Sequence, residues 1–175
     1  MASSSPKSTT EESCAYVLGD DGLARWSDTH ADAWIGLLET HKRLTRAMDA
    51  ELEAEYGLSL SGVEVLGRLA AAENRNLRLS VLANACGLSL SRVSRIVDAL
   101  EARELVERRA SAADARVVEA HLLDSGLDLV RQAQASHFES VQQRFFEQLS
   151  PDEIQTLAAV FSRFAPGATQ DCTES

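Results

Sequence analysis

The sequence predicts a mainly α-helical protein that contains a winged helix-turn-helix with a small β-hairpin wing. Apolar residues recur at helical spacing through most of the 175 residues, and only nine Gly and three Pro interrupt them. Residues 80–101 predict two short helices joined by a tight turn at Gly87, since glycine readily takes the positive φ that ends a helix. Residues 106–122 predict a two-stranded hairpin.

A polar tail and a long helix precede this centre. Residues 1–20 are expected to be a disordered tail by composition. A helix should follow over about 26–56 and end at Gly57, because its apolar stripe repeats at alternating spacings of four and three, as in a helix packed along a partner. The stripe consists of Trp34, Leu38, His41, Thr45, Met48 and Leu52. Ser59 or Ser61 should cap a shorter helix that supports the two short helices from behind.

The second short helix, from Ser89 or Leu90, carries the first candidate binding face. Its buried stripe at helical period consists of Val93, Ile96, Val97 and Leu100. The opposite face carries the guanidinium and hydroxyl groups of Ser91, Arg92, Ser94 and Arg95, with Ser89 as the cap beside them. Arginine binds guanine edges through paired hydrogen bonds, and serine binds bases or phosphates, so this face is a candidate DNA reader. An ordinary solvated helix face with surface arginines remains the alternative.

The hairpin adds further candidate contacts. Its strands should span residues 106–109 and 116–122, around a tip of small residues. A hairpin tip beside a helix in the major groove can reach the neighbouring minor groove, whose negative potential attracts arginine. Arg116 is placed for that role, and Asp114 can hold its guanidinium in an extended orientation. The alternative is a surface ion pair that only stiffens the hairpin. The strand arginines Arg108 and Arg109 complete the candidate DNA contacts.

Two further helices are expected after the hairpin. The first should span about residues 126–148. The second has a start signal in Ser150-Pro151-Asp152-Glu153, where serine caps the helix and glutamate stands three residues later. Its apolar residues should be buried: Ile154, Leu157, Ala158, Phe161 and Phe164. Either a partner subunit or the chain's own core could bury the apolar faces at the two ends of the sequence, and periodicity does not decide between them.

The most specific motif resembles the MarR family of bacterial winged-helix transcriptional regulators. Residues 94–109, SRIVDALEARELVERR, are followed by Asp114-Ala115-Arg116, Leu122 and Gly126 in the order and spacing typical of that family. By order of elements, the resemblance extends from about Trp26 to Phe164.

Two positions depart from the family pattern. Glu104 stands where the family usually has glycine, so a left-handed helix end there would be strained by up to roughly 1 kcal/mol. Leu123 replaces the usual threonine, so Asp124 or Ser125 would have to cap the following helix. Neither position lies on the candidate DNA-reading face.

The resemblance implies a homodimer with two reading heads on a palindromic DNA operator, and we expect a repressor that a small ligand releases. It divides the chain into a tail at 1–20, a MarR-type domain at 21–165 (winged helix-turn-helix at about 58–123, dimerisation helices at about 26–56 and 124–165) and a tail at 166–175. Family members bind effectors between the dimerisation helices and the head. The lining candidates here are Trp26, Trp34, His41 and Glu64. Glu64 is included because it occupies the position of an acidic residue in the urate-responsive branch; dimer packing for Trp34 and plain surface exposure for Glu64 remain alternatives.

Composition limits the possible function classes. The net charge of −10 argues against nonspecific coating of nucleic acid or anionic membranes. Residues 78–118 nevertheless hold seven arginines and five acidic residues, net +2, against −12 for the rest of the chain. No apolar run approaches the roughly 20 residues of a membrane span, and no signal peptide is visible, so we expect a cytoplasmic protein.

Catalytic, metal and cofactor motifs do not stand out. The sequence has no Gly-rich phosphate loop, nucleophile elbow or paired catalytic carboxylates, and its cysteines and histidines lack zinc-site spacing, so we expect neither an enzyme nor a cofactor. Cys86 should pack in the core as a small hydrophobe, whereas Cys14 is a surface thiol or, alternatively, a redox sensor. A winged-helix protein-interaction module is a further alternative, although it would not need Arg92, Arg95 and Arg116 together.

Overall fold

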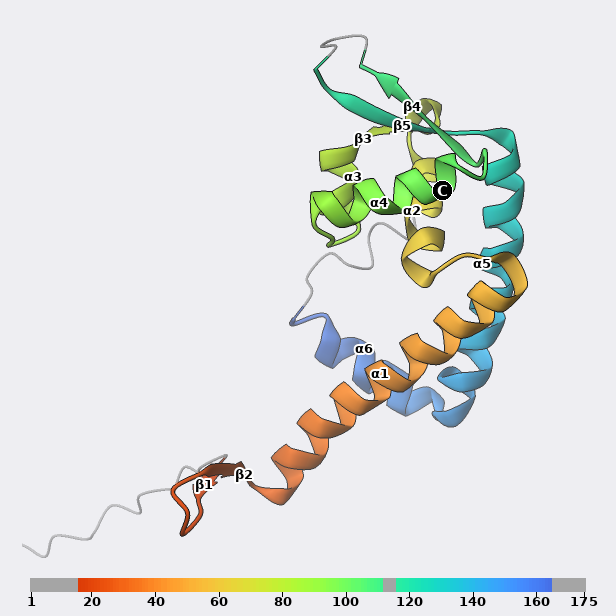
Figure 1. The fold of residues 1–175 in the computed structure, drawn as a ribbon. Coiled ribbons are helices and arrows are strands. Elements are labelled where there is room, and N and C mark those ends of the chain that lie inside the picture. Colours follow the sequence, from red (N-terminus) through yellow and green to blue (C-terminus); the bar gives the residue numbers. More distant parts are fainter. Residues whose placement is uncertain (1–15, 112–115, 165–175) are drawn as a thin grey trace, which may run out of the picture. The chain divides into compact units, whose positions relative to one another are not determined.

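The computed structural model describes residues 16–111 and 116–164 (Figure 1). The chain divides into two compact units, an N-terminal unit (Met1–Arg43) and a C-terminal unit (Leu44–Ser175), and helix α1 (Asp28–Tyr56) contributes to both. Helices dominate and a small antiparallel sheet forms the wing, which confirms the predicted fold class. In the described ranges, no helix is long and apolar enough to cross a membrane.

The N-terminal unit begins with a short hairpin that the sequence does not predict. Strands β1 (Tyr16–Leu18) and β2 (Ala24–Trp26) pair antiparallel, and the rings of Tyr16 and Trp26 meet edge to face with their centroids 6.4 Å apart. The predicted tail at 1–20 is therefore wrong for residues 16–20, while residues 1–15 lie outside the described chain. Strands of three residues are too short to show an alternating pattern in the sequence.

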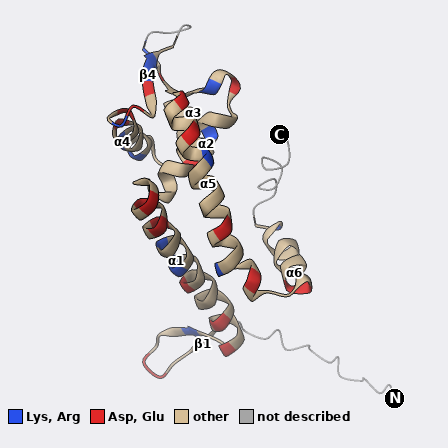
Figure 2. Ribbon diagram, turned by 90° about the vertical axis from the view of Figure 1, so that its right-hand side faces the viewer, with Lys and Arg blue, Asp and Glu red and all other residues tan. Residues whose placement is uncertain are grey.

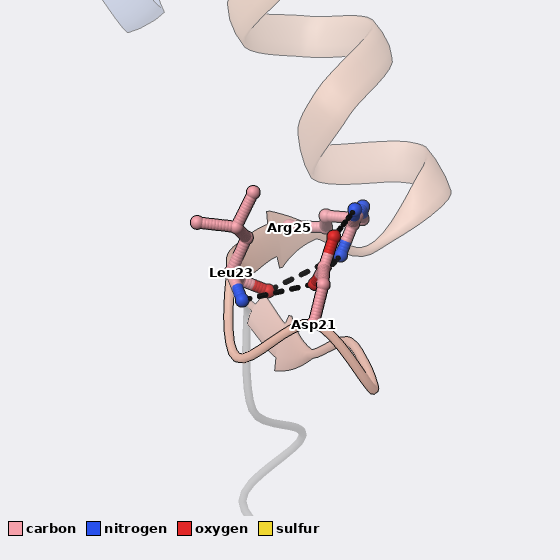
Figure 3. Close-up of polar contacts among 3 residues, drawn as sticks. All are labelled: Asp21, Leu23 and Arg25. Carbon is pink, nitrogen blue, oxygen red and sulfur yellow. Dashed lines mark hydrogen bonds and ion pairs between the residues drawn. The ribbon is translucent and has the colours of Figure 1, made fainter.

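Local contacts fix the turn of this hairpin (Figure 3). The Asp21 carboxylate accepts hydrogen bonds from the Leu23 backbone N–H at 3.0 Å and from the Arg25 guanidinium at 2.6 Å. The Arg25 hydrogen bond, and then the Leu23 one, lower the pKa of Asp21 to about 2. Gly22 takes a positive φ of 74° in the same turn.

Helix α1 ends as predicted at Gly57, whose φ is +63°. The Gly57 N–H donates to the Glu53 carbonyl at 3.0 Å, and the Leu58 N–H donates to the Leu52 carbonyl at 3.3 Å, which together form a Schellman motif. The apolar stripe of α1 divides along its length. Met48 and Leu52 are buried in the C-terminal unit, whereas Trp34, Ile35, Leu37 and Leu38 in the N-terminal unit are each at least 38 % exposed.

Three helices form the head of the C-terminal unit: α2 (Leu60–Ala71), α3 (Leu79–Ala85) and α4 (Leu90–Glu101). The Ser59 hydroxyl caps α2 by accepting from the Gly62 N–H at 3.1 Å, and the Ser89 hydroxyl caps α4 by accepting from the Arg92 N–H at 3.4 Å. Gly87, with φ of +62°, reverses the chain between α3 and α4. The predicted helix-turn-helix and its caps are confirmed.

A three-stranded antiparallel sheet completes the head. Its order is β3 (Asn76–Arg78), β5 (Val118–Leu122) and β4 (Val106–Ala110). The β4–β5 pair is the predicted hairpin. The third strand, β3, was not predicted: it follows the short 3-10 helix η1 (Glu73–Arg75) and pairs with β5, placing Leu77 opposite Ala120. This pairing joins segments about 40 residues apart, so local sequence carries little sign of it.

The two positions that depart from the family pattern have definite conformations. Glu104 has a φ of +57°, the left-handed conformation predicted for it. At the start of α5 (Asp124–Arg144) no side chain caps the helix; Ser125 instead donates to the Glu104 carbonyl at 2.5 Å, so the predicted replacement cap is wrong. Gly126 lies so close to β4 that a Cβ there would come within 2.2 Å of the Leu105 carbonyl oxygen.

The core of the C-terminal unit is built from one face of each head element and from α5. Its fully buried members include Val65, Leu66 and Leu69 on α2, Leu82 on α3, Val93 and Val97 on α4, Ala120 and Leu122 on β5, and Val130 and Ala133 on α5. The core therefore holds helix α4 along the face that carries Val93 and Val97, and the opposite face of the helix points away from the core.

Beyond α5, the short 3-10 helix η2 (Phe146–Gln148) leads to α6 (Pro151–Phe161), which begins with the predicted capping box at Ser150. No residue of α6 is buried, and Phe161 and Phe164 are 42 % and 81 % exposed. The predicted burial of this face is therefore wrong for the single chain, because periodicity identifies an apolar face but not the surface that covers it.

Candidate nucleic-acid interface

The exposed face of α4 carries the first group of predicted contacts. Since Val93 and Val97 are fully buried, Ser91, Arg92 and Arg95 lie on the solvent side of the helix. The Arg92 guanidinium donates to the Ser61 hydroxyl at 3.2 Å, and Arg95 Nε donates to the Ser91 carbonyl at 3.4 Å. A guanidinium has five N–H donors, so these single bonds leave each arginine able to bind a base edge or a phosphate.

Hydroxyl groups gather at the N-terminal end of the same helix. The Ser89 and Ser91 hydroxyls lie 3.2 Å apart, and both residues are exposed. Backbone N–H groups at a helix start, together with the helix dipole, favour an anion such as a phosphate. The structure thus brings these two predicted residues together with Arg92 on one surface.

Ser94 and Arg108, also predicted to contact DNA, bind each other, and their contact with DNA stays a prediction. Arg108 on β4 donates to the Ser94 carbonyl at 2.9 Å and to its hydroxyl at 3.0 Å, and pairs with Asp98 at 2.5 Å. Its backbone N–H donates to Glu101 at 2.8 Å, and its side chain is only 27 % exposed. These contacts tie β4 to α4, a role that the sequence did not predict because Arg108 and Ser94 lie 14 residues apart on different elements.

The outer part of the wing keeps its predicted arginines at the surface. Arg109 is half exposed and forms an ion pair with Glu107 on the same strand. Arg116 is exposed at the turn that precedes β5. Asp114, the predicted partner of Arg116, lies outside the described residues.

A polar cluster that the sequence did not reveal lies near the loop end of the hairpin, where β5 pairs with β3. Glu119 on β5 accepts a hydrogen bond from the Asn76 amide on β3 and lies 3.7 Å from Arg78. Hydrogen bonds from Ser111, which is 93 % buried, and from Asn76 lower the pKa of Glu119. The only sequence signal was alternation along β5, which puts Glu119 on the face opposite buried Ala120. The cluster ties the loop-side ends of β4 and β5 to β3.

Charge is unevenly distributed in the C-terminal unit. Figure 2 shows acidic residues along α1 and α5 and both signs of charge on β4. The last turns of α1 contain four acids: Asp49, Glu51, Glu53 and Glu55. Some are paired, since Glu51 binds both Arg144 and the Ser140 hydroxyl on α5, which lower its pKa. Such acidic surfaces repel a polyanion, so they are unsuited to binding nucleic acid.

A cavity of about 550 Å³ lies between the end of α1, the start of α2 and one flank of α4. Its floor is apolar, formed largely by Leu58, Ile96 and Leu100, and its walls include the guanidinium groups of Arg92, Arg95 and Arg103. The sequence does not predict this cavity, because it depends on how three elements pack.

The predicted effector residues are divided between the two units. Trp26 on β2, with Trp34 and His41 on α1, belongs to the N-terminal unit, where the two tryptophans are about half exposed. Glu64 is exposed on α2 in the C-terminal unit. The effector site therefore stays a prediction.

Cys86 is the one cysteine in the described part of the chain. Cys86 is buried as predicted, and burial, then the Glu64 carboxylate, raises the pKa of its thiol to about 11, so it is a poor nucleophile. Cys14 lies outside the described residues. In the described part of the chain no three His, Cys, Asp or Glu side chains group as a metal site would require.

Comparison with known proteins identifies relatives of the whole described fold. A family model described as MarR family matches residues 56–117, from the end of α1 into the wing. The solved structure of AbsC, a MarR family transcriptional regulator from Streptomyces coelicolor, is 32 % identical, with a TM-score of 0.74 over 81 % of this chain and 95 % of that one. Sco3205, a MarR family transcriptional regulator from the same organism solved in complex with DNA, is 28 % identical, with a TM-score of 0.76 over 82 % of this chain and 90 % of that one.

More distant structures share the fold alone. MarR from E. coli in its apo form is 20 % identical, with a TM-score of 0.64 over 74 % of this chain and 94 % of that one. No curated protein matches the sequence.

Proposed function

Because this chain belongs to the MarR family, we propose that it is a transcriptional regulator that binds double-stranded DNA through α4 and the β4–β5 wing. The observation that carries the proposal is the exposed pair Arg92 and Arg95, which the buried stripe of α4 turns away from the core. The DNA complex of Sco3205, a relative of similar fold, supports it.

The residues divide into base readers and phosphate binders. Arg92 and Arg95 enter the major groove and bind base edges, because they have the longest side chains on the exposed face of α4. Ser89 and Ser91 at the start of α4 bind a backbone phosphate. Arg116 reaches the neighbouring minor groove from the wing, and Arg109 binds a phosphate beside it.

The regulator acts as a homodimer. The exposed apolar side chains on β2, on the first half of α1 and around α6 include two tryptophans and two phenylalanines, the residue types that contribute most to subunit interfaces. A two-fold dimer places two copies of α4 on a palindromic operator, with half-sites about 34 Å apart. Binding over a promoter blocks transcription, so the regulator is a repressor.

A small anionic or aromatic ligand releases this repressor. The residues proposed to bind it are Trp26, Trp34, His41 and Glu64, as the resemblance to the family implies. Ligand binding favours a spacing of the two heads that no longer matches adjacent half-sites, and operator affinity falls.

The experiment that tests DNA reading is binding-site selection from random duplexes with the full chain. A palindromic consensus should emerge, and Arg92→Ala or Arg95→Ala should each lose about 1 to 3 kcal/mol of affinity and relax preference at one base pair per half-site. Arg131→Ala, on the exposed surface of α5, is the matched control and should keep the wild-type affinity. If no consensus emerges, or if the Arg131 variant loses as much as the α4 variants, the proposal is wrong.

A further inference from the structure

Arg103 connects the end of α4 to the end of α1. It lies one residue beyond Ala102, the C-cap of α4. Its Nη1 donates to the Gly57 carbonyl at 2.5 Å, and its Nη2 donates to the Tyr56 carbonyl at 2.8 Å. A single planar group therefore holds two consecutive carbonyl groups more than 40 residues away in the sequence.

The end of α1 lacks a positive charge and hydrogen-bond donors of its own for its last carbonyl groups. The last turn of α1 contains no basic residue, and Glu53 and Glu55 place negative charge near the negative end of the helix dipole. The Schellman motif uses the N–H groups of Gly57 and Leu58 but leaves the carbonyls of Tyr56 and Gly57 facing outward. Arg103 supplies both the donors and the positive charge from another element.

The surroundings of Arg103 make this link mechanically important. The 550 Å³ cavity lies along the same flank of α4, where packed side chains would otherwise fix the angle between α4 and the end of α1. Because this cavity is open to solvent, few packed side chains join α1 to α4 across it. Arg103 bridges the cavity at the C-terminal end of α4 by binding Gly57 on its other side, and Arg92 contacts Ser61 on α2 near the start of α4. Two parallel hydrogen bonds from a rigid fork also restrict orientation more than a single bond does.

We propose that Arg103 is a positioning residue that transmits the direction of α1 to α4 and so sets the separation of the two recognition helices in the dimer. The inference rests on the proposed function, because it requires a dimer that reads two half-sites. Arg103 itself contacts no DNA in this scheme. Its loss leaves each head able to bind its half-site but lets the angle of α4 vary.

The test measures operator affinity as a function of half-site spacing. The selected operator is rebuilt with its half-sites moved by one and two base pairs in each direction, and one further duplex keeps a single half-site. The wild-type chain should show a sharp optimum. Arg103→Met, which keeps a long uncharged side chain, should lower the ratio between best and displaced spacing by about fivefold or more, the scale of a typical coupling between sites. Its affinity for the single half-site should match the wild type.

Two further variants and a measurement of the salt slope make each outcome decisive. Arg103→Lys keeps the charge but not the fork, so it should show an intermediate spacing profile, and it replaces the Met variant if that variant does not fold. Arg131→Met is the control for loss of an exposed arginine and should keep the sharp optimum.

An unchanged spacing profile in the Arg103 variants overturns this inference but leaves the proposed function standing. A uniform loss at every spacing, with a salt slope lower by about one, makes Arg103 a phosphate contact and also overturns it. If the wild-type chain selects no duplex, the proposed function and this inference both fail.

Discussion

Adjacent arginines on β4 should respond to the same substitution in opposite ways. Arg108→Met removes two hydrogen bonds to Ser94 and the ion pair with Asp98, whereas Arg109→Met removes one ion pair with Glu107. Hydrogen bonds to a charged group contribute about 1.5 to 3 kcal/mol each when buried. Since the Arg108 side chain is 27 % exposed, we expect about 2 kcal/mol in total from its loss, after allowing for solvent screening. The half-exposed Arg109 should contribute no more than about 0 to 1 kcal/mol.

Urea unfolding and salt-dependent DNA binding together test this contrast. The Arg108 variant should lose stability without a change in the denaturant slope, and its salt slope for DNA binding should stay near the wild-type value. The Arg109 variant should keep its stability but bind DNA more weakly, with a salt slope lower by about one. If Arg108→Met lowers the salt slope while stability is unchanged, its guanidinium binds phosphate and the reasoning is refuted.

Three other substitutions test local geometry and the wing. Gly126→Ala should destabilise the fold by about 3 kcal/mol or more in urea unfolding, because its Cβ would meet the Leu105 carbonyl at 2.2 Å; a fully stable variant would contradict this packing. Glu104→Gly should stabilise by up to about 1 kcal/mol in thermal unfolding, since Glu104 has a φ of +57°; a loss of stability would count against strain there. Arg116→Ala should cut operator affinity and lower the salt slope by about one without a change in melting temperature, and Asp114→Ala should weaken binding although it removes a negative charge; tighter binding by the Asp114 variant would refute the proposed role of the wing.

Local sequence signals predicted most of the helices and the left-handed conformation of Glu104. Capping residues such as Ser59, Ser89 and Ser150 act within three residues of themselves, so the sequence predicts the helix starts they produce. Glycine at Gly57 and Gly87 marks helix ends for the same reason. These features depend on neighbouring residues alone, which is why they could be predicted.

The features that the sequence could not predict depend on distant partners. Strand β3 forms by pairing with the edge of β5. Arg108 binds Ser94 on α4, and does not extend into solvent, because the wing packs against that helix. Arg103 looks like any helix-end arginine until the fold places the carbonyls of α1 beside it. The exposed face of α6 shows the same limit, since an apolar pattern predicts that a face will be covered but not by what.

The central claim, that this chain reads DNA sequence through the exposed face of α4, is tested most directly by one ratio. The affinity of the full chain for its selected duplex is divided by its affinity for a scrambled duplex of equal length and composition, at a single salt concentration. For the wild-type chain this ratio should be about 10³ or more, the lower range for specific regulators, and it should fall about tenfold or more in Arg95→Ala. A ratio near one for the wild-type chain, or an undiminished ratio in that variant, would contradict it.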